Sequence, residues 1–279
     1  MKRDAEVDMP KKIGHPIAAS PDVQLKCTIC GAPSQPAGVA DLNKSGNDYF
    51  EGRAMFPASG VEVRYHRCVD CGFLFTDHFA RWEPGEFSHR IYNDDYLLAD
   101  PPFADERPEK LSHFLAEALG PEHRELSILD YGGGVGALER KLRDRGFVNL
   151  QTFDPHHPSN ATPPERPVAL VTAFEVLEHV WDQHALVKQI SSLLVPDGCL
   201  VFSTLLQPTE RDQADASWWY ACPRNAHMSL HTARSLECLF SKIGFRLHSL
   251  SDELHIAFAT QGVLVERFVA QRPTLRVNE

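Results

Sequence analysis

Residues 129–138 read LDYGGGVGAL, a glycine-rich stretch that follows a hydrophobic run and has an acidic residue just before its glycines. The hydrophobic run predicts a strand at residues 126–130, and residues 135–145 predict a helix that ends at Gly146. Glycine lets the backbone turn tightly and lets a ligand approach without a Cβ in the way. A strand, a glycine turn and a helix in this order predict a dinucleotide or nucleoside site at the carboxyl end of the strand.

Two ligand classes fit the glycine pattern. Gly132, Gly134 and Ala137 satisfy G-x-G-x-x-A, which is typical of NAD and FAD sites. The first two glycines together with Gly136 also satisfy G-x-G-x-G, the pattern of S-adenosylmethionine (SAM) sites. The carboxylate of Asp130 favours SAM, because it would repel a pyrophosphate and attract an ammonium and a sulfonium.

A second acid, Asp154, ends the next predicted strand, 24 residues after Asp130. A carboxylate at this place can accept both ribose hydroxyls of an adenosine. This feature supports an adenosine ligand and suits NAD and SAM equally.

Strands and helices alternate through most of the remaining chain, which predicts an α/β fold with a parallel sheet covered on both faces. The last two predicted strands follow each other closely and are expected to form an antiparallel edge. Besides those around the glycines, the predicted strands are 61–67, 148–153, 168–174, 199–204, 254–260 and 262–268, and the predicted helices are 109–120, 182–195 and 233–243.

The composition narrows the function classes. Hydrophobic residues make up 43% of the 279 residues and charged residues 24%, which is ordinary for a globular protein. The formal net charge of −10 argues against nucleic acid as a partner, because such proteins neutralise phosphates with a basic face. No apolar run reaches the roughly 18 residues that span a bilayer, and no secretory signal is recognised. We therefore expect a cytoplasmic protein with no membrane partner and a flexible tail at residues 1–20.

Four of the seven cysteines form two C-x-x-C-G motifs with 37 residues between them: Cys27, Cys30, Cys68 and Cys71. Four thiolates from two such turns predict tetrahedral coordination of Zn²⁺. Since the protein supplies all four ligands, the metal is expected to be structural. We predict a zinc-ribbon-like domain and a connecting lid segment at residues 21–104.

Several further stretches make the interpretation of the glycine motif specific. Together with LDYGGGVGAL and FDP (153–155), they resemble the class I SAM-dependent methyltransferase family over residues 109–260. The resemblance implies a Rossmann-like sheet of seven strands, the last antiparallel, in a methyltransferase domain at residues 105–279. These stretches are AFEVLEHVWD (173–182), LLVPDGCLVFST (193–204) and HMSLHTARSLECLFSKIGF (227–245).

The resemblance also implies a cofactor site. The glycine loop would wrap the methionine end of SAM, the acid after the next strand would bind the ribose, and the end of the third strand would pass under the sulfonium. Residues 156–167 depart from the family, which often has a further strand there, so the adenine contact is not assigned. The implied cofactor-binding residues are Asp130, Gly132, Gly134, Asp154, Phe174 and Glu175.

Glu175, Glu178 and His179 lie three and four positions apart, so a helical turn would place them on one face. This E-x-x-E-H pattern resembles a divalent-metal site of some relatives, including ubiquinone-pathway O-methyltransferases and small-RNA 2′-O-methyltransferases. His227 matches the later histidine of that site. The resemblance implies Mg²⁺ or Mn²⁺ at these four residues, with Glu178, His179 and His227 as catalytic candidates. Two alternatives stay open: these residues pack under the site without a metal, or His179 is a direct base.

Two groups of aromatic residues are candidates for the acceptor side. Trp218, Trp219 and Tyr220 would contact a ring or a sugar, and Tyr92 and Tyr96 would form part of a lid over the cofactor. The alternative for the first group is a packed insertion or an oligomer contact, and the alternative for the two tyrosines is simple packing between domains.

A zinc ribbon ahead of a methyltransferase resembles a bacterial subgroup associated with sugar, cell-surface glycan or secondary-metabolite modification. The implied function is methyl transfer from SAM to a hydroxyl of a small molecule or of a sugar or glycan. The alternatives are a SAM-fold adaptor without catalysis and an RNA 2′-O-methyltransferase, against which the acidic charge weighs. The sequence does not indicate the oligomeric state.

Overall fold

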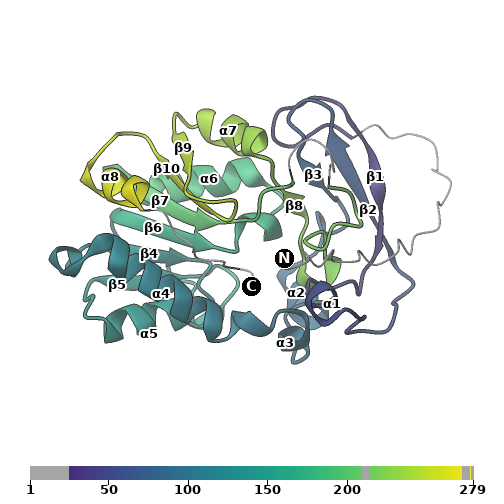
Figure 1. Cartoon of the computed structure of the whole chain (residues 1–279), viewed down its shortest axis with the longest axis horizontal. Coiled ribbons are helices and arrows are strands. Elements are labelled where there is room, and N and C mark those ends of the chain that lie inside the picture. Colours follow the sequence, from purple (N-terminus) through teal and green to yellow (C-terminus); the bar gives the residue numbers. More distant parts are fainter. Residues whose placement is uncertain (1–24, 209–213, 272–276, 278–279) are drawn as a thin grey trace, which may run out of the picture.

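The structure is a computed structural model that describes residues 25–208, 214–271 and 277. The tail predicted at residues 1–20 lies outside the described residues. The chain forms two sheets that lie beside each other (Figure 1). In the part of the chain that is described, no helix is long and apolar enough to cross a membrane.

The larger sheet has the strand order β5-β4-β6-β7-β10-β9, and the alternation of strands and helices confirms the predicted α/β fold. Strands β5, β4, β6 and β7 are parallel to their neighbours, whereas β10 runs antiparallel to both β7 and β9. The strands are β4 Ile128–Tyr131, β5 Leu150–Phe153, β6 Val168–Phe174, β7 Leu194–Ser203, β9 Arg246–Ser249 and β10 Leu254–Phe258. The helices around this sheet are α4 Glu106–Leu119, α5 Ala137–Asp144, α6 Gln183–Ser192, α7 Ala233–Ser241 and α8 Val263–Ala270.

Two details of this sheet differ from the prediction. Residues 262–268 form the helix α8 instead of a strand, because buried Val265 and Phe268 are three positions apart and face the core together. The edge position belongs to β9, which sequence reasoning missed. The described sheet also has six strands instead of seven: residues 156–167 are rich in proline, which cannot donate main-chain hydrogen bonds to a sheet.

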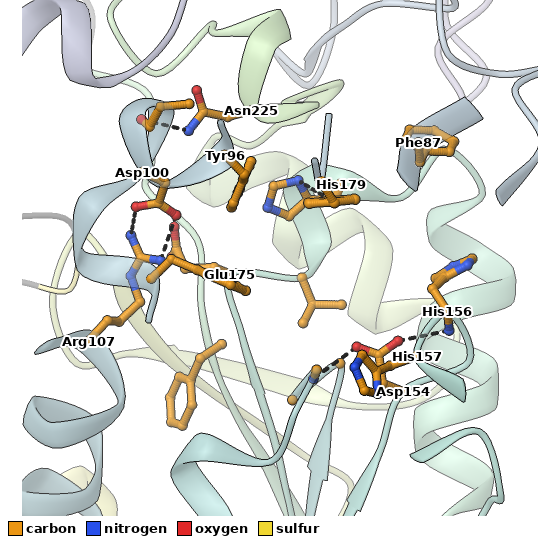
Figure 2. Close-up of a pocket in the computed structure, with 18 of the residues that line it drawn as sticks. Phe87, Tyr96, Asp100, Arg107, Asp154, His156, His157, Glu175, His179 and Asn225 are labelled. Atoms are coloured by element: carbon orange, nitrogen blue, oxygen red, sulfur yellow. Dashed lines mark hydrogen bonds and ion pairs between the residues drawn. The ribbon is translucent and has the colours of Figure 1, made fainter. Parts of the chain in front are cut away.

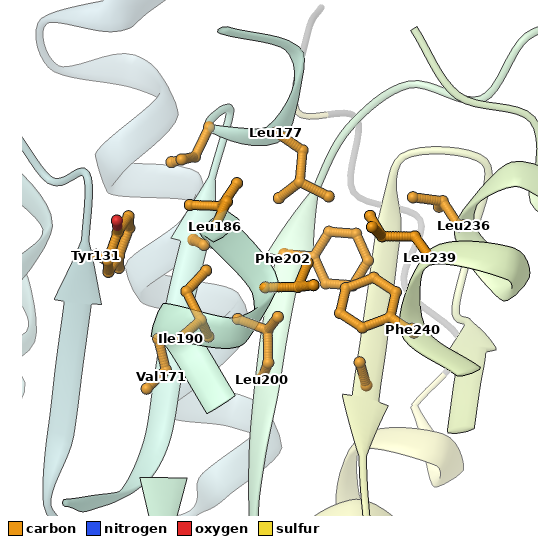
Figure 3. Packing of buried hydrophobic residues seen from close by; sticks show 14 of the residues in the cluster. Tyr131, Val171, Leu177, Leu186, Ile190, Leu200, Phe202, Leu236, Leu239 and Phe240 are labelled. Carbon is orange, nitrogen blue, oxygen red and sulfur yellow. The ribbon is translucent and has the colours of Figure 1, made fainter. Parts of the chain in front are cut away.

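Buried apolar side chains fill both faces of the larger sheet. On one face, Leu186 and Ile190 of α6 and Phe240 of α7 pack against Val171 and Phe202 of the strands (Figure 3). On the other face, α4, α5 and α8 cover a second cluster. Burial of this kind contributes about 25 cal/mol per Å² of apolar surface, so the two clusters fix the strand ends that carry the site.

The smaller sheet has four antiparallel strands in the order β1-β2-β3-β8. Three of them lie close together in the sequence, but β8 comes from the second half of the chain and pairs with β3 through Leu74↔Leu230 and Phe75↔Ser229. We call the contact between residues 73–76 and 227–232 the junction. The strands are β1 Ser34–Asp41, β2 Glu62–Cys68, β3 Leu74–Phe75 and β8 Ser229–Leu230, and the helices nearby are α1 Asn47–Glu51, α2 Pro84–Arg90 and α3 Tyr96–Ala99.

The four cysteines of the two C-x-x-C-G motifs meet at one end of the smaller sheet. Their sulfur atoms all lie within 4.8 Å of one another, as the motif spacing predicted. The turns around them also contact α6 and both ends of α7: the main-chain oxygen of Ile29 accepts hydrogen bonds from His184 and Lys242, and that of Cys71 accepts one from Thr232. The cysteine cluster is therefore attached to both halves of the chain.

Candidate active site

The glycine loop follows β4 and has a backbone that other residues rarely adopt. Gly132, Gly134 and Gly136 have φ values of 74°, 53° and 75°. A Cβ on Gly133 would lie 2.1 Å from the carboxylate of Asp130, so this position excludes any side chain. The loop therefore brings bare main chain to the ends of the strands.

Two acids flank the loop as the sequence predicted. The main-chain N–H of Gly134 donates to Asp154 Oδ2 at 2.9 Å, and that of His156 donates to Oδ1 at 2.8 Å. The hydroxyl of Thr172 donates to Asp130 Oδ1 at 3.0 Å. Burial raises the pKa of Asp130 to about 7, so a nearby cation would favour its ionised form.

A cavity of about 1330 Å³ lies at these strand ends, and segments of both halves of the chain line it (Figure 2). In Figure 2, Asp154 lies on one side of the cavity and the Asp100–Arg107 ion pair on the other. All six residues implied to bind the cofactor line it. The other predicted residues in the lining are Tyr92, Tyr96, His179, Trp219, Tyr220 and His227.

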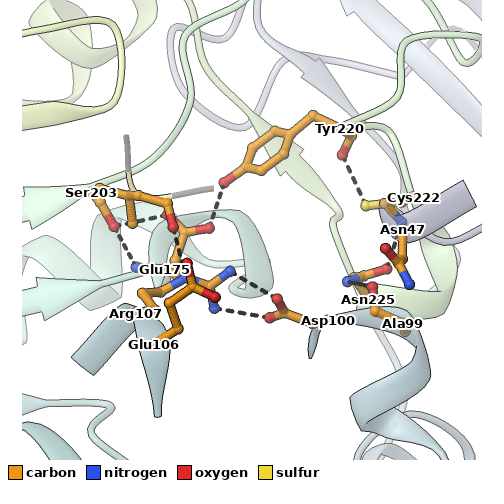
Figure 4. A network of polar contacts seen from close by, with 12 residues as sticks. Asn47, Ala99, Asp100, Glu106, Arg107, Glu175, Ser203, Tyr220, Cys222 and Asn225 are labelled. Atoms are coloured by element: carbon orange, nitrogen blue, oxygen red, sulfur yellow. Dashed lines mark hydrogen bonds and ion pairs between the residues drawn. The ribbon is translucent and has the colours of Figure 1, made fainter. Parts of the chain in front are cut away.

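Glu175 has a left-handed backbone with φ 52°, which is uncommon for a residue with a side chain. Its carboxylate accepts hydrogen bonds from the hydroxyls of Ser203 at 2.8 Å and Tyr220 at 3.1 Å (Figure 4). These contacts hold Glu175 at the end of β6, facing the cavity.

Glu178 is fully buried and is not among the residues that line the cavity. Its Oε1 shares the single hydroxyl hydrogen of Tyr220 with Glu175, and Oε2 has no hydrogen-bond partner. Burial raises the pKa of Glu178 well above its usual value, and the charge of Glu175 adds to the effect. Glu178 therefore has one buried oxygen that could bind a proton or a cation.

His179 and His227 lie side by side, with ring centroids 4.9 Å apart. Desolvation lowers the pKa of His179 to about 4 and that of His227 well below its usual value, so both rings are neutral at pH 7. Tyr92 Oη lies 3.3 Å from His179 Nδ1, and His227 Nδ1 lies 2.8 Å from the main-chain oxygen of Tyr220. The ligand atoms of Glu178, His179 and His227 all lie within 4.8 Å of one another.

The aromatic candidates divide into two groups. Trp219 and Tyr220 line the cavity, whereas Trp218 is outside its lining and packs on Tyr220 with ring centroids 5.4 Å apart. Tyr92 and Tyr96 meet edge to face at 5.1 Å and line the cavity beside His179.

A family model described as a methyltransferase domain matches residues 103–250, which is 148 of the 279 residues. The chain belongs to this methyltransferase family. The matched residues include the glycine loop, both flanking acids, Glu178 and the two candidate histidines, His179 and His227. A comparison with curated proteins finds no match.

Solved structures resemble parts of this methyltransferase. CalO1, a methyltransferase of calicheamicin biosynthesis in its SAH-bound form, shares 15% identity over 54% of each chain with a TM-score of 0.38. TnmH shares 16% over 66% of this chain and 64% of its own, with a TM-score of 0.48. Human N-acetylserotonin methyltransferase in complex with SAM shares 15% over 64% of this chain and 63% of its own, with a TM-score of 0.41.

Sequence reasoning missed several polar residues of the methyltransferase cavity. Arg107 and Asp100 form a bidentate ion pair at 2.9 and 2.8 Å, and Asn225 donates to the main-chain oxygen of Ala99 at 3.3 Å. No motif surrounds these residues. The one available signal was a charged residue, Arg107, in the first turn of a helix that follows a proline-rich connection.

Proposed function

We propose that this methyltransferase uses SAM to methylate a hydroxyl of a small molecule or of a sugar or glycan. The observation that carries the proposal is one cavity with two kinds of lining. On one side are a glycine loop and Asp154, suited to an adenosine. On the other are the neutral imidazoles of His179 and His227, suited to a hydroxyl.

For the cofactor, the proposed roles follow from charge and geometry. Asp154 accepts the ribose hydroxyls, and the bare main chain of Gly132 to Gly134 lets the adenosyl group lie against the loop. Asp130 and Glu175 contribute negative charge near the expected sulfonium and ammonium. A cavity of about 1330 Å³ exceeds the usual range for a single small ligand, about 300–1,000 Å³, which supports binding of an acceptor beside the cofactor.

When bound, SAM supplies an activated methyl group that needs no further chemical activation. The chain must then align the acceptor, exclude water and take a proton from the hydroxyl. In the tautomer whose Nδ1–H donates to the hydroxyl of Tyr92, neutral His179 has a lone pair on Nε2 that can accept the proton. His227 lies beside it, and Tyr220 holds both Glu175 and Glu178 in place.

The same residues also suit a divalent cation. Glu178 Oε2 is buried without a partner, and two neutral imidazoles lie within 4.8 Å of that carboxylate. One carboxylate and two imidazoles suit Mn²⁺ better than Mg²⁺, which prefers oxygen ligands. Glu175, which the resemblance also implied as a ligand, is outside this group. A cation held there would lower the pKa of an acceptor hydroxyl.

For the cysteine cluster, we propose Zn²⁺ in a structural role. Four thiolates whose sulfur atoms lie within 4.8 Å of one another match its preferred ligands and coordination number. The cluster is attached to α6 and to the segment after α7, and it does not line the cavity. A stabilising metal outside the chemistry is the role that this position supports.

Calorimetric titration with SAM tests the cofactor assignment. The wild type should bind with micromolar affinity, and Gly133→Ala should weaken binding by about 100-fold because its Cβ would displace the carboxylate of Asp130. Gly85→Ala is the matched control: no atom lies within 4 Å of its added Cβ, and it should bind like the wild type. A wild type that binds no SAM would favour the adaptor alternative.

A further inference from the structure

The charged side chains that line the cavity are almost all acidic. Among the described residues, the lining contains seven carboxylates but a single arginine and no lysine. Such a cavity attracts the sulfonium and ammonium of SAM, but SAM also carries a carboxylate, which needs a cation or N–H donors. The carboxylates are those of Glu51, Asp94, Asp100, Asp130, Asp154, Glu175 and Asp182, and the arginine is Arg107.

The glycine loop offers that carboxylate few donors, because three of its N–H groups already have acceptors. Gly134 donates to Asp154 at 2.9 Å. Gly132 and Gly136 donate to main-chain oxygens at 2.8 and 2.9 Å. A carboxylate on the loop would also lie close to Asp130 and be repelled by it.

Arg107 lines the cavity and has unused donors. Its side chain is 9% exposed and lies in the first turn of α4. Nη1 and Nη2 donate to Asp100 at 2.9 and 2.8 Å, and Nε donates to the main-chain oxygen of Val277 at 3.2 Å. A guanidinium has five N–H groups, so two remain without an acceptor within the described part of the chain.

We propose that Arg107 binds the carboxylate of the methionine part of SAM, and that Asp100 is the residue that positions the guanidinium. This inference rests on the proposed cofactor. If Asp154 holds the ribose, the methionine part extends across the cavity toward Arg107, which lies on the opposite side (Figure 2). Glu175 lies near Arg107 and interacts with it electrostatically, so an ammonium and a carboxylate find opposite charges next to each other.

The ion pair also explains why this cation is held so firmly. An arginine without its carboxylate partner would be free to move in a largely buried position. With Asp100 bound to Nη1 and Nη2, the remaining N–H groups have fixed directions, and one of them can donate to a second carboxylate. Asp100 follows α3 directly, so the cofactor contact extends to the segment that carries Tyr96.

A pair of ligands that differ only in the carboxylate tests this assignment. Calorimetry would compare SAM with decarboxylated SAM on the wild type and on the double variant D100N/R107M, which removes both charges and leaves no unpaired buried ion. We expect the wild type to bind SAM about 10- to 100-fold more tightly than the decarboxylated compound. The double variant should bind the two equally or prefer the decarboxylated compound. R107K should keep part of the preference, and K110M, on the same helix outside the cavity lining, should keep all of it.

Each other outcome has a definite meaning. A wild type that binds both compounds equally overturns the role of Arg107 while leaving the cofactor assignment intact. A double variant that still prefers SAM by the wild-type factor shows that the carboxylate is held elsewhere, and also overturns it. A wild type that binds neither compound overturns the proposed cofactor and this inference together.

Discussion

The two sheets of this methyltransferase differ in where their strands come from. All strands of the larger sheet lie within one half of the chain, residues 128–258. The smaller sheet has three strands within residues 34–75, and its fourth strand, β8, consists of residues 229–230. Because His179 follows β6 of the larger sheet and His227 precedes β8 of the smaller sheet, each sheet positions one of the two candidate histidines. The candidate site therefore depends on both sheets, even though one sheet alone carries the predicted cofactor loop.

The largest expected effect comes from breaking the cysteine cluster. We expect Cys71→Ser to remove the bound zinc and to lower the free energy of unfolding by more than about 3 kcal/mol, since binding of a structural metal is part of the folding free energy. Because Thr232 donates to the main-chain oxygen of Cys71, the loss should reach the junction and weaken SAM binding as well. Elemental analysis and urea unfolding measure the first two effects, and calorimetry measures the third.

Cys238→Ser is the matched control, because Cys238 is half-buried and outside the cluster. It should keep its zinc and stay within about 1 kcal/mol of the wild type. A wild-type protein without zinc contradicts the metal assignment. A Cys71→Ser variant that loses zinc but binds SAM normally would show that the two sheets are independent.

The same comparison explains what could be predicted from the sequence. The larger sheet could be predicted because its signals are local: a hydrophobic run, the glycines after Asp130 and a helix follow one another directly. The cysteine cluster could also be predicted, since the chemistry of four thiolates does not depend on the fold between them. Strand β8 could not, because two residues carry no periodicity and its partner, β3, lies about 155 positions away.

The residues of the candidate site also divide into those that local motifs predict and those that depend on tertiary contacts. Asp130, Asp154 and the glycines were found because a motif places them at strand ends. Arg107 was missed because its role depends on a tertiary contact with Asp100, which no spacing rule reveals. The interpretation of residues 262–268 as a strand was wrong because an apolar run of this length fits a strand and a buried helix equally well.

The second-largest expected effect is a loss of stability in acid. It is predicted for two buried histidines, His231 at the junction and His255 in the larger sheet. Burial lowers the pKa of His231 to about 3 and that of His255 to about 4. Below pH 6.5 the unfolded chain binds protons on both residues, while the folded chain binds them only near pH 4 at His255 and near pH 3 at His231. The free energy of unfolding should therefore fall by about 3 kcal/mol per histidine as the pH falls from 6.5 to 4.

Urea unfolding at several pH values measures this slope. His231→Asn and His255→Asn should each reduce it by a similar amount, and His248→Asn, at an exposed position, should leave it unchanged. His231 packs on Phe73 at 4.9 Å and bonds to Gln183 of α6, so it contacts both halves of the chain. If the two sheets unfold together, both variants change the same unfolding transition. Two separate transitions, only one of which His255→Asn changes, would contradict this.

The smallest expected effect is on cation binding between His179 and His227. We expect Mn²⁺, followed by electron paramagnetic resonance, to bind the wild type, and His227→Asn to weaken this binding by about 10- to 100-fold. Glu178→Gln should act similarly, because it replaces the carboxylate whose Oε2 has no partner. His89→Asn, at an exposed position in α2, is the matched control and should bind Mn²⁺ like the wild type.

The result separates the two chemistries that this pair of histidines can support. Loss of Mn²⁺ binding in both variants would place a cation between a ligand from the larger sheet and one next to β8, so that metal binding itself requires the junction. Equal Mn²⁺ binding by the wild type and His227→Asn would exclude the cation from this position. The neutral His179 would then act as a base without a metal. The smaller sheet would be needed only to position His227 beside it.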